Sequence, residues 1–243
     1  MKNITLLILI LALIHLATPW CLKTTVNLTN AVTKVDFSPD GLWIAVTSSS
    51  ANEVYIYDTT NYFLNTTYTP STSTVNVARW SKDGTYIAIG HANGKVDFLN
   101  GASPFGDAGI AITPSNKDII DLDFNWNNNM LMICYSDDNS FRIVDNIAGT
   151  PTSRLRDTGE KQISCRFSKM DVAVVARQNK EIRTYAIPAS GTINDFVTKV
   201  KGDMEWTDVA VKPVTTTPVK IVASGGNNAQ DGGSYFTNSG SNN

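Results

Sequence analysis

Short hydrophobic runs alternate with polar residues along most of the chain, and turn-forming residues separate the runs. Residues 37–58 show this pattern most clearly. The Pro-Asp-Gly triplet at 39–41 predicts a tight turn, because Pro fixes φ, Asp bonds nearby backbone and Gly accepts a positive φ. The runs at 43–47 and 54–57 are rich in β-branched and aromatic residues, which favours two strands joined by a hairpin.

This segment recurs at a nearly constant spacing. The large apolar residue that ends its first run is found at Phe37, Trp80, Phe124, Phe167 and Val211, so that successive copies lie 43 or 44 residues apart. A period of this length, with several short strands in each copy, is typical of β-propeller repeats. The repeat therefore predicts the fold more directly than any single motif does.

Each of the first four copies contains four strand-like runs, and the fifth contains three. We therefore expect an all-β fold, a five-bladed β-propeller of four-stranded antiparallel blades. The predicted blades cover residues 32–68, 75–113, 119–156, 162–201 and 206–238. The alternating run at 22–29 has no partner before the first copy. We expect this N-terminal strand to join the last blade and close the ring, because closure removes open sheet edges.

The repeated pattern resembles that of the WD-repeat β-propellers. The resemblance is carried by Phe-Ser-Pro-Asp-Gly at 37–41, Val-Tyr-Ile-Tyr-Asp at 54–58 and Trp-Ser-Lys-Asp-Gly at 80–84, and it extends over about residues 22–238. The family's Gly-His pair before the first run is absent from every copy, and its Trp-Asp pair is replaced, for example by Tyr-Asp at 57–58. The family's buried polar network is therefore not expected here. Members usually have seven blades, so either five blades form a small ring or another chain completes it.

The first 21 residues differ in composition from the rest of the chain. Lys2 precedes a nearly continuous apolar run at 4–16, and Ala-Thr-Pro at 17–19 ends it. This pattern predicts a secretory signal peptide over residues 1–21 and leaves 22–243 as the propeller domain. The alternative is an uncleaved signal anchor, although the run is shorter than the roughly 20 residues that span a bilayer. We expect a secreted or cell-surface protein that contacts a membrane only through this segment, if it stays uncleaved.

Composition narrows the range of partners. The net charge is −2, charged residues make up 17% of the chain, and no basic stripe is present, which argues against nucleic acid as a partner. Asn27 and Asn65 begin Asn-x-Thr triplets, so both are candidate glycosylation sites if the chain enters a eukaryotic secretory route. Cys134 and Cys165 fall in predicted strands of neighbouring copies. In an oxidising compartment they can form a disulfide, and the alternative is two buried free thiols.

Residues suited to catalysis or metal binding are scarce. His91 is the one histidine outside the signal segment, and we expect it in an exposed loop. The acidic stretch at 137–140 lacks calcium-loop spacing and is better explained as a hairpin turn. Nucleophile elbows, phosphate loops and Cys-x-x-Cys pairs are absent from the sequence. We therefore expect no catalytic residue, metal or cofactor.

The first run of each copy carries charges at a fixed position. Asp36, Arg79, Asp123 and Arg166 each stand immediately before the large apolar residue that ends the run. Since this run should form the innermost strand, we expect these side chains near the central channel, linked in one network of ion pairs between blades. The alternative is a charged channel that binds a small polar ligand or a cation. Two residues earlier, on the same face, stand Lys34, Val77, Asp121, Ser164 and Asp208.

These features predict a non-enzymatic scaffold. Rigid sheets would present loops to other proteins, including copies of the same chain, outside the cell. A carbohydrate-binding propeller is the alternative, since a surface rich in Ser, Thr and Asn also suits glycans. A glycosidase is a third reading that requires unpaired carboxylates in the channel.

Overall fold

The computed structural model describes residues 25–26, 28, 30–70, 73–169, 171–194, 198–201, 205–211, 219–225 and 233–239. The described chain is built from strands joined by turns and loops. The strands are β1 (Lys34–Phe37), β2 (Trp43–Ser48), β3 (Glu53–Asp58), β4 (Leu64–Tyr68), β5 (Val75–Trp80), β6 (Tyr86–His91), β7 (Val96–Asn100), β8 (Asp107–Ile112), β9 (Ile119–Phe124), β10 (Met130–Tyr135), β11 (Ser140–Asp145), β12 (Thr152–Asp157), β13 (Gln162–Phe167), β14 (Val172–Arg177), β15 (Glu181–Ala186), β16 (Thr198–Lys201), β17 (Trp206–Val211), β18 (Val219–Gly225) and β19 (Gly233–Ser239).

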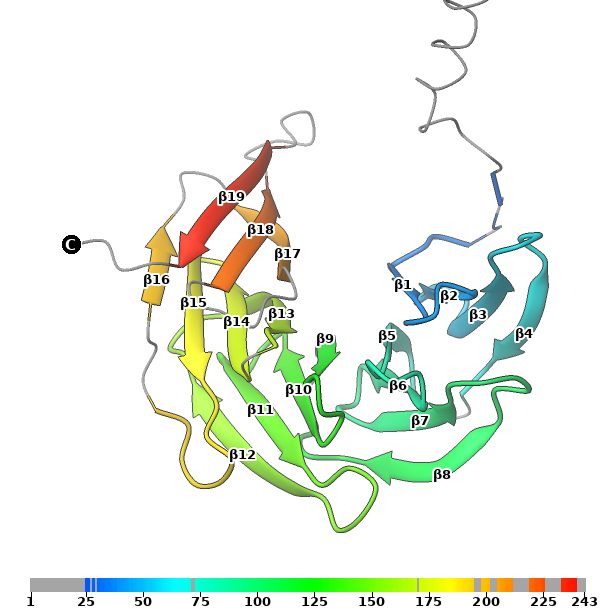
Figure 1. Cartoon of the computed structure of the whole chain (residues 1–243), viewed down its shortest axis with the longest axis horizontal. Coiled ribbons are helices and arrows are strands. Elements are labelled where there is room, and N and C mark those ends of the chain that lie inside the picture. Colours follow the sequence, from blue (N-terminus) through cyan, green and yellow to red (C-terminus); the bar gives the residue numbers. More distant parts are fainter. Residues whose placement is uncertain are drawn as a thin grey trace, which may run out of the picture.

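Consecutive strands pair in antiparallel fashion and form four four-stranded sheets, β1–β4, β5–β8, β9–β12 and β13–β16, and one three-stranded sheet, β17–β19. The sheets are arranged as blades around a central axis (Figure 1), with β1, β5, β9, β13 and β17 innermost and the last strand of each complete sheet at the periphery. Adjacent innermost strands contact one another around this axis. The expected all-β, propeller-like architecture is confirmed.

Four apolar cores hold the sheets together, each one made by the facing sides of two neighbouring sheets. Between the first two sheets, for example, Ile56 packs with Trp80 and Ile87. Corresponding cores lie between the second and third, the third and fourth, and the fourth and fifth sheets. Burial of one large apolar side chain stabilises the fold by roughly 1.5–3 kcal/mol, so these junctions supply most of the cohesion between sheets.

The turn between the first two strands of each of the first four sheets explains the repeated sequence motif. Gly41 and Gly84 adopt φ of 74° and 76°, and the corresponding residues of the next two copies, Asn128 and Asp171, adopt 55° and 51°. Gly, Asn and Asp are the residues that tolerate this left-handed region best. The backbone conformation of the turn therefore determines the last residue of the motif, which can be Gly, Asn or Asp.

Closure of the ring is where the structure departs from the expectation of five complete blades. Among the described residues, four blades have four strands, and the fifth sheet consists of β17, β18 and β19. Of the stretch 22–29, the described residues Thr25, Val26 and Leu28 lie outside any strand, and among the described strands β19 pairs with β18 alone. The arc of sheets is open between β1–β4 and β17–β19 (Figure 1). The predicted five four-stranded blades, with strand 22–29 in the last, are therefore wrong for this structure, because a regular strand pattern does not by itself provide a pairing partner.

The signal segment predicted at 1–21 and the candidate site Asn27 lie outside the described residues. Within the described stretches of the chain, no helix has the length and apolar character needed to cross a bilayer.

Candidate functional site at the channel mouth

A row of hydroxyl and amide side chains fixes the turns at one end of the central channel. Ser38 Oγ accepts the N–H of Trp43 at 2.9 Å and donates to Asp40 Oδ1 at 2.6 Å. Ser81 makes the same bonds with Tyr86 and Asp83 in the second sheet. These bonds close each turn against the start of the second strand, so the innermost strand ends at a defined point and its last side chains reach the channel.

Arg79 connects three sheets within the channel. Its Nη1 lies 3.4 Å from Asp36 Oδ1 of β1, and its Nη2 lies 3.0 Å from Asp121 Oδ1 of β9. Its Nε also donates to the backbone oxygen of Leu122 at 3.3 Å. The arginine is buried, so its charge requires these acceptors.

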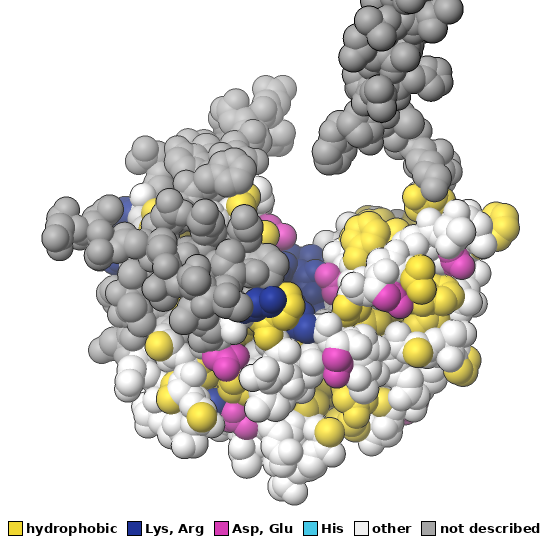
Figure 2. All heavy atoms as spheres, viewed as in Figure 1, with side chains coloured by type: hydrophobic (Ala, Val, Ile, Leu, Met, Phe, Trp, Pro, Cys, Tyr) yellow, Lys and Arg dark blue, Asp and Glu magenta, His cyan; other side chains and the backbone are white. Residues whose placement is uncertain are grey.

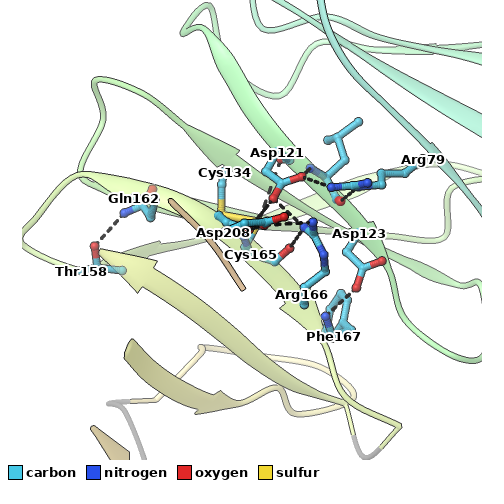
Figure 3. Close-up of a disulfide and its surroundings, with 12 residues drawn as sticks. Arg79, Asp121, Asp123, Cys134, Thr158, Gln162, Cys165, Arg166, Phe167 and Asp208 are labelled. Carbon is cyan, nitrogen blue, oxygen red and sulfur yellow. Dashed lines mark hydrogen bonds and ion pairs between the residues drawn. A yellow bond between two sulfur atoms is a disulfide. The ribbon is translucent and has the colours of Figure 1, made fainter. Parts of the chain in front are cut away.

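Arg166 extends the same network to the fourth and fifth sheets (Figure 3). Its Nη1 lies 2.5 Å from Asp121 Oδ2, and its Nη2 lies 3.3 Å from Asp208 Oδ1 of β17. Ser164 Oγ lies 2.7 Å from Asp121 Oδ2 and also contacts Asp208. Asp121 is therefore the fully buried centre of a chain of charges that touches every sheet.

Asp123 stands apart from that chain of ion pairs, contrary to the expectation that it would link the two arginines. Its Oδ1 lies 2.6 Å from Lys82 Nζ, and its Oδ2 accepts the N–H of Phe167 at 2.7 Å. Asp36 acts in the same way at the preceding junction, where its Oδ2 accepts the N–H of Trp80 at 2.8 Å. Both carboxylates thus tie the end of the next sheet's first strand, and Asp121 takes the role predicted for Asp123.

The positions of these charged groups shift the pKa values of several of them. Burial alone would raise the pKa of Asp121, but Arg166 and Arg79 outweigh it and hold that pKa well below its usual range. For Arg166 burial opposes the charge, whereas Asp121 and the other nearby carboxylates raise its pKa further above the usual value. Burial raises the pKa of Asp36, an effect that Arg79 offsets incompletely.

The network lies beside a pocket of about 380 Å³ at one end of the central channel, and all five sheets contribute residues to it. We call this pocket the channel mouth; it is lined by Asp36, Phe37, Pro39, Trp80, Ser81, Lys82, Asp123, Trp126, Arg166, Phe167 and Val211. Cationic and acidic side chains are visible in the central hollow of the surface (Figure 2). Lys169 Nζ lies 4.5 Å from the ring centre of Trp126, a cation–π contact at the rim. The pocket combines aromatic walls with carboxylates that already hold strong partners.

Cys134 of β10 and Cys165 of β13 form a disulfide between the third and fourth sheets (Figure 3). Both residues are buried, with their Cα atoms 6.5 Å apart. Of the two arrangements that the sequence leaves open, the structure has the cross-link rather than free thiols. It lies in the core between the third and fourth sheets, next to Asp121, whose Oδ2 accepts the N–H of Cys165 at 3.2 Å.

His91 is buried at the end of β6, so its expected position in an exposed loop is wrong. Its Nε2 lies 3.0 Å from Asp97 Oδ2, and its Nδ1 lies 3.3 Å from the backbone oxygen of Ser73. Burial lowers the pKa of His91, although Asp97 acts in the opposite direction. The strand is one residue longer than its apolar pattern suggests, which brings this polar residue inside.

Asn65 is exposed on β4, the outermost strand of the first sheet, where the β3–β4 register shifts. A glycan there would extend into solvent. Among the described residues, no group of three His, Cys, Asp or Glu side chains is arranged as a metal site.

Two members of the network, Asp121 and Asp208, were recognisable in the sequence only as residues on the same face as the predicted charges. Side chains two residues apart on a strand share a face, so the face was predictable. Which of the two carboxylates of β9 meets the arginines depends on the offset between neighbouring sheets, which a single strand's pattern does not encode.

Comparison with known proteins supports the architecture. Residues 20–58 match the family described as "WD domain, G-beta repeat", a stretch that contains the first three strands. Curated protein sequences give no match. The matched repeat and the radial arrangement of antiparallel sheets together support a WD-repeat-like β-propeller.

Proposed function

We propose that the protein is a secreted, non-enzymatic β-propeller scaffold that binds other proteins and belongs to an extracellular or cell-surface assembly. WD-repeat propellers are characteristically interaction scaffolds rather than enzymes, which is the coarse functional expectation for this chain. Secretion rests on the leader-like segment at 1–21.

One observation carries the proposal: the channel carboxylates serve the fold. Asp36, Asp121 and Asp123 hold Arg or Lys side chains and backbone N–H groups. A glycosidase needs two carboxyl groups that face its substrate, and carboxylates engaged in this way are poorly placed for that role. The outer surface, in contrast, presents apolar side chains in quantity, of which Phe63 is 73% exposed. Such groups suit protein contacts.

The test uses the full chain expressed in a eukaryotic secretory host. We expect the protein in the medium, without the leader, and we expect chemical cross-linking at the native cell surface to trap it with defined protein partners. Native mass spectrometry would distinguish copies of the same chain from other proteins. Retention inside the cell would refute secretion.

A glycan array and a glycosidase assay on the same material test the alternatives. Specific, saturable glycan binding by the monomer would replace the scaffold with a carbohydrate-binding function. Turnover of a glycoside that is lost on replacing Asp36 or Asp123 by Asn would replace it with an enzyme. We expect neither, and no affinity for nucleic acid.

A further inference from the structure

Exposed apolar side chains are concentrated in one region of the molecule. Among the described residues, eight large hydrophobic side chains are exposed, and all but Leu155 lie between residues 26 and 64, in the first sheet and its approach. The remaining seven are Val26, Val32, Val35, Phe37, Leu42, Phe63 and Leu64. Yellow apolar surface is visible over the first sheet in Figure 2. Exposed apolar side chains gathered on one part of a surface suit contact with a partner.

Four of these side chains form a row along one end of the sheet, which we call the first-sheet edge: Phe37, Leu42, Phe63 and Leu64. Phe37 ends β1, Leu42 immediately precedes β2, Phe63 immediately precedes β4, and Leu64 begins β4. With neighbouring strands about 4.8 Å apart, the row runs roughly 14 Å from the channel outwards. Phe37 also lines the channel mouth, so the row continues directly from that pocket.

Backbone bonds hold this edge rigid. Thr59 donates its N–H to Leu42 O at 2.9 Å and its hydroxyl to Gly41 O at 2.7 Å, which joins the two turns of the sheet. Asp58 donates its N–H to Phe63 O at 3.0 Å. A surface that is already ordered loses little conformational entropy when a partner binds.

The charge of the first sheet is strongly one-sided. Between Lys34 and Arg79 the chain contains no Lys, Arg or His, whereas it contains Asp36, Asp40, Glu53 and Asp58. The whole chain has 20 basic and 22 acidic residues, so this imbalance is local. Asp40 and Asp58 lie on the two turns of the edge, each fixed through Oδ1 by a backbone N–H, from Leu42 and Thr60 respectively. The hydroxyl of Ser38 lowers the pKa of Asp40, so this carboxylate stays ionised.

We propose that the first-sheet edge binds a peptide segment of another protein in which apolar side chains alternate with Lys or Arg. The apolar residues would cover Leu42, Phe63 and Leu64 and enter the channel mouth beside Phe37. The cations would face Asp40 and Asp58. Opposite charge at the rim gives orientation and specificity, while the apolar row supplies the binding energy. The inference rests on the proposed scaffold function and names the surface and the chemistry of its partner.

The test measures fluorescence anisotropy of labelled 12-residue peptides with the full mature chain. One probe alternates Lys with Leu and Phe, a second replaces every Lys by Glu, and a third replaces every Leu and Phe by Ser. We expect the first to bind at least about tenfold more tightly than either counterpart, and more weakly as salt is raised. Equal binding of the Lys and Glu peptides would overturn the proposal.

Paired variants locate the site. F63S/L64S should weaken binding of the Lys peptide about tenfold or more, a loss typical of a binding hot spot. L155S removes a Leu that is 48% exposed, against 49% for Leu64, but lies outside the first sheet, and it should have no effect. D40N/D58N keeps the side-chain oxygens that hold the turns and should abolish the salt dependence. An equal loss in L155S would contradict the assignment, and unfolding curves identify any variant that fails to fold.

Two other occupants give distinct results. A dimer seen by light scattering, and lost in F63S/L64S, would assign the edge to a second copy and overturn the peptide proposal. Binding to phosphatidylcholine vesicles that is lost in the same variant would assign it to lipid, with the same effect. If cross-linked protein partners from the secreted chain still bind F63S/L64S unchanged, the scaffold function stands and this surface assignment fails.

Discussion

Asp121 Oδ1 lies 3.0 Å from Arg79 Nη2, although the two residues are 42 positions apart and belong to different sheets. The contact repeats in reverse on the other side, where Asp121 Oδ2 meets Arg166. One buried carboxylate is therefore shared by two arginines from flanking sheets, which also contact Asp36 and Asp208. Loss of Asp121 would leave the two arginines with fewer anionic partners in the channel, so the network should be sensitive to substitution of this residue.

Asp121→Asn should destabilise the protein by about 3 kcal/mol or more, because it leaves the buried Arg79 and the half-buried Arg166 without their shared anion. Urea unfolding at pH 7 measures the loss. Asp137→Asn is the matched control, since it breaks an ion pair with Lys161 in which both side chains are largely exposed. That variant should unfold at the wild-type midpoint. A midpoint for Asp121→Asn equal to that of the control would contradict the structural role of the network.

The dependence of stability on pH in the acid range should report the same interaction, because the proton affinity of Asp121 changes on folding. The pKa of Asp121 is lower in the folded state than its ordinary value of 3.8. Its contribution to stability is therefore complete above that value and is lost as the pH falls below it, because the unfolded state then binds the proton more readily. Urea midpoints between pH 5 and pH 2 should fall more steeply for the wild type than for Asp121→Asn. Parallel curves would show that Asp121 titrates normally in the folded protein.

His91 should produce a separate pH effect at higher pH. Its pKa is lowered from the ordinary 6.5, so below that value the unfolded state takes up the proton more readily than the folded state. Stability should therefore decline as the pH falls from 7.5 to 5.5. In His91→Gln this contribution to the decline should disappear, as measured by urea unfolding at the two pH values. An unchanged slope in the variant would show that another group is responsible.

Removal of the disulfide should destabilise the fold by roughly 3 kcal/mol, since the cross-link closes a loop with a sequence separation of 31 residues. The C134A/C165A double variant tests this by thermal unfolding, and some of its loss will come from the two small vacated volumes. Reductant should lower the unfolding temperature of the wild type only. A wild type indifferent to reductant under unfolding conditions would contradict a stabilising role.

The conformation of the repeated turn predicts that replacement by Ala affects stability differently at two glycines. Gly41→Ala should cost about 1 kcal/mol, because its φ of 74° is unfavourable for a residue with a Cβ. Gly106→Ala is the control, since a Cβ there would also meet open space but without a positive φ. That substitution should leave stability unchanged or slightly raised. Equal losses in the two variants would remove backbone conformation as the reason for the motif.

Much of the fold was predictable because its determinants are local. The turn motif and the alternation around it predict the positions of five strands, β2, β3, β5, β9 and β13, and the structure has them there. The face that carries the channel charges was also predictable, since side chains alternate along a strand. The residues that these side chains contact were harder to predict from the sequence. Choosing Asp121 over Asp123 needs the offset between two sheets, and the burial of His91 needs the neighbouring loop at Ser73.

Whether the ring closes also depends on contacts between residues that are far apart in the sequence. Among the described residues the last sheet has three strands, whatever the pattern of the N-terminal run, because pairing needs a partner in space as well as a suitable sequence. The first-sheet edge was likewise missed, although its signal was present in the sequence. The stretch without Lys, Arg or His between Lys34 and Arg79 is visible on inspection. Its meaning depends on the exposure of Phe63 and Leu64, which only the structure supplies.

The disulfide has a mechanical consequence. Each sheet is joined to the next through its own core, and one of these four junctions, between the third and fourth sheets, is covalently locked by Cys134 and Cys165. If the two termini were pulled apart, the disulfide would carry the force directly from Cys134 to Cys165, so the chain between them, with β11 and β12, could not be extended. A stretched molecule would therefore stop short of its full contour length.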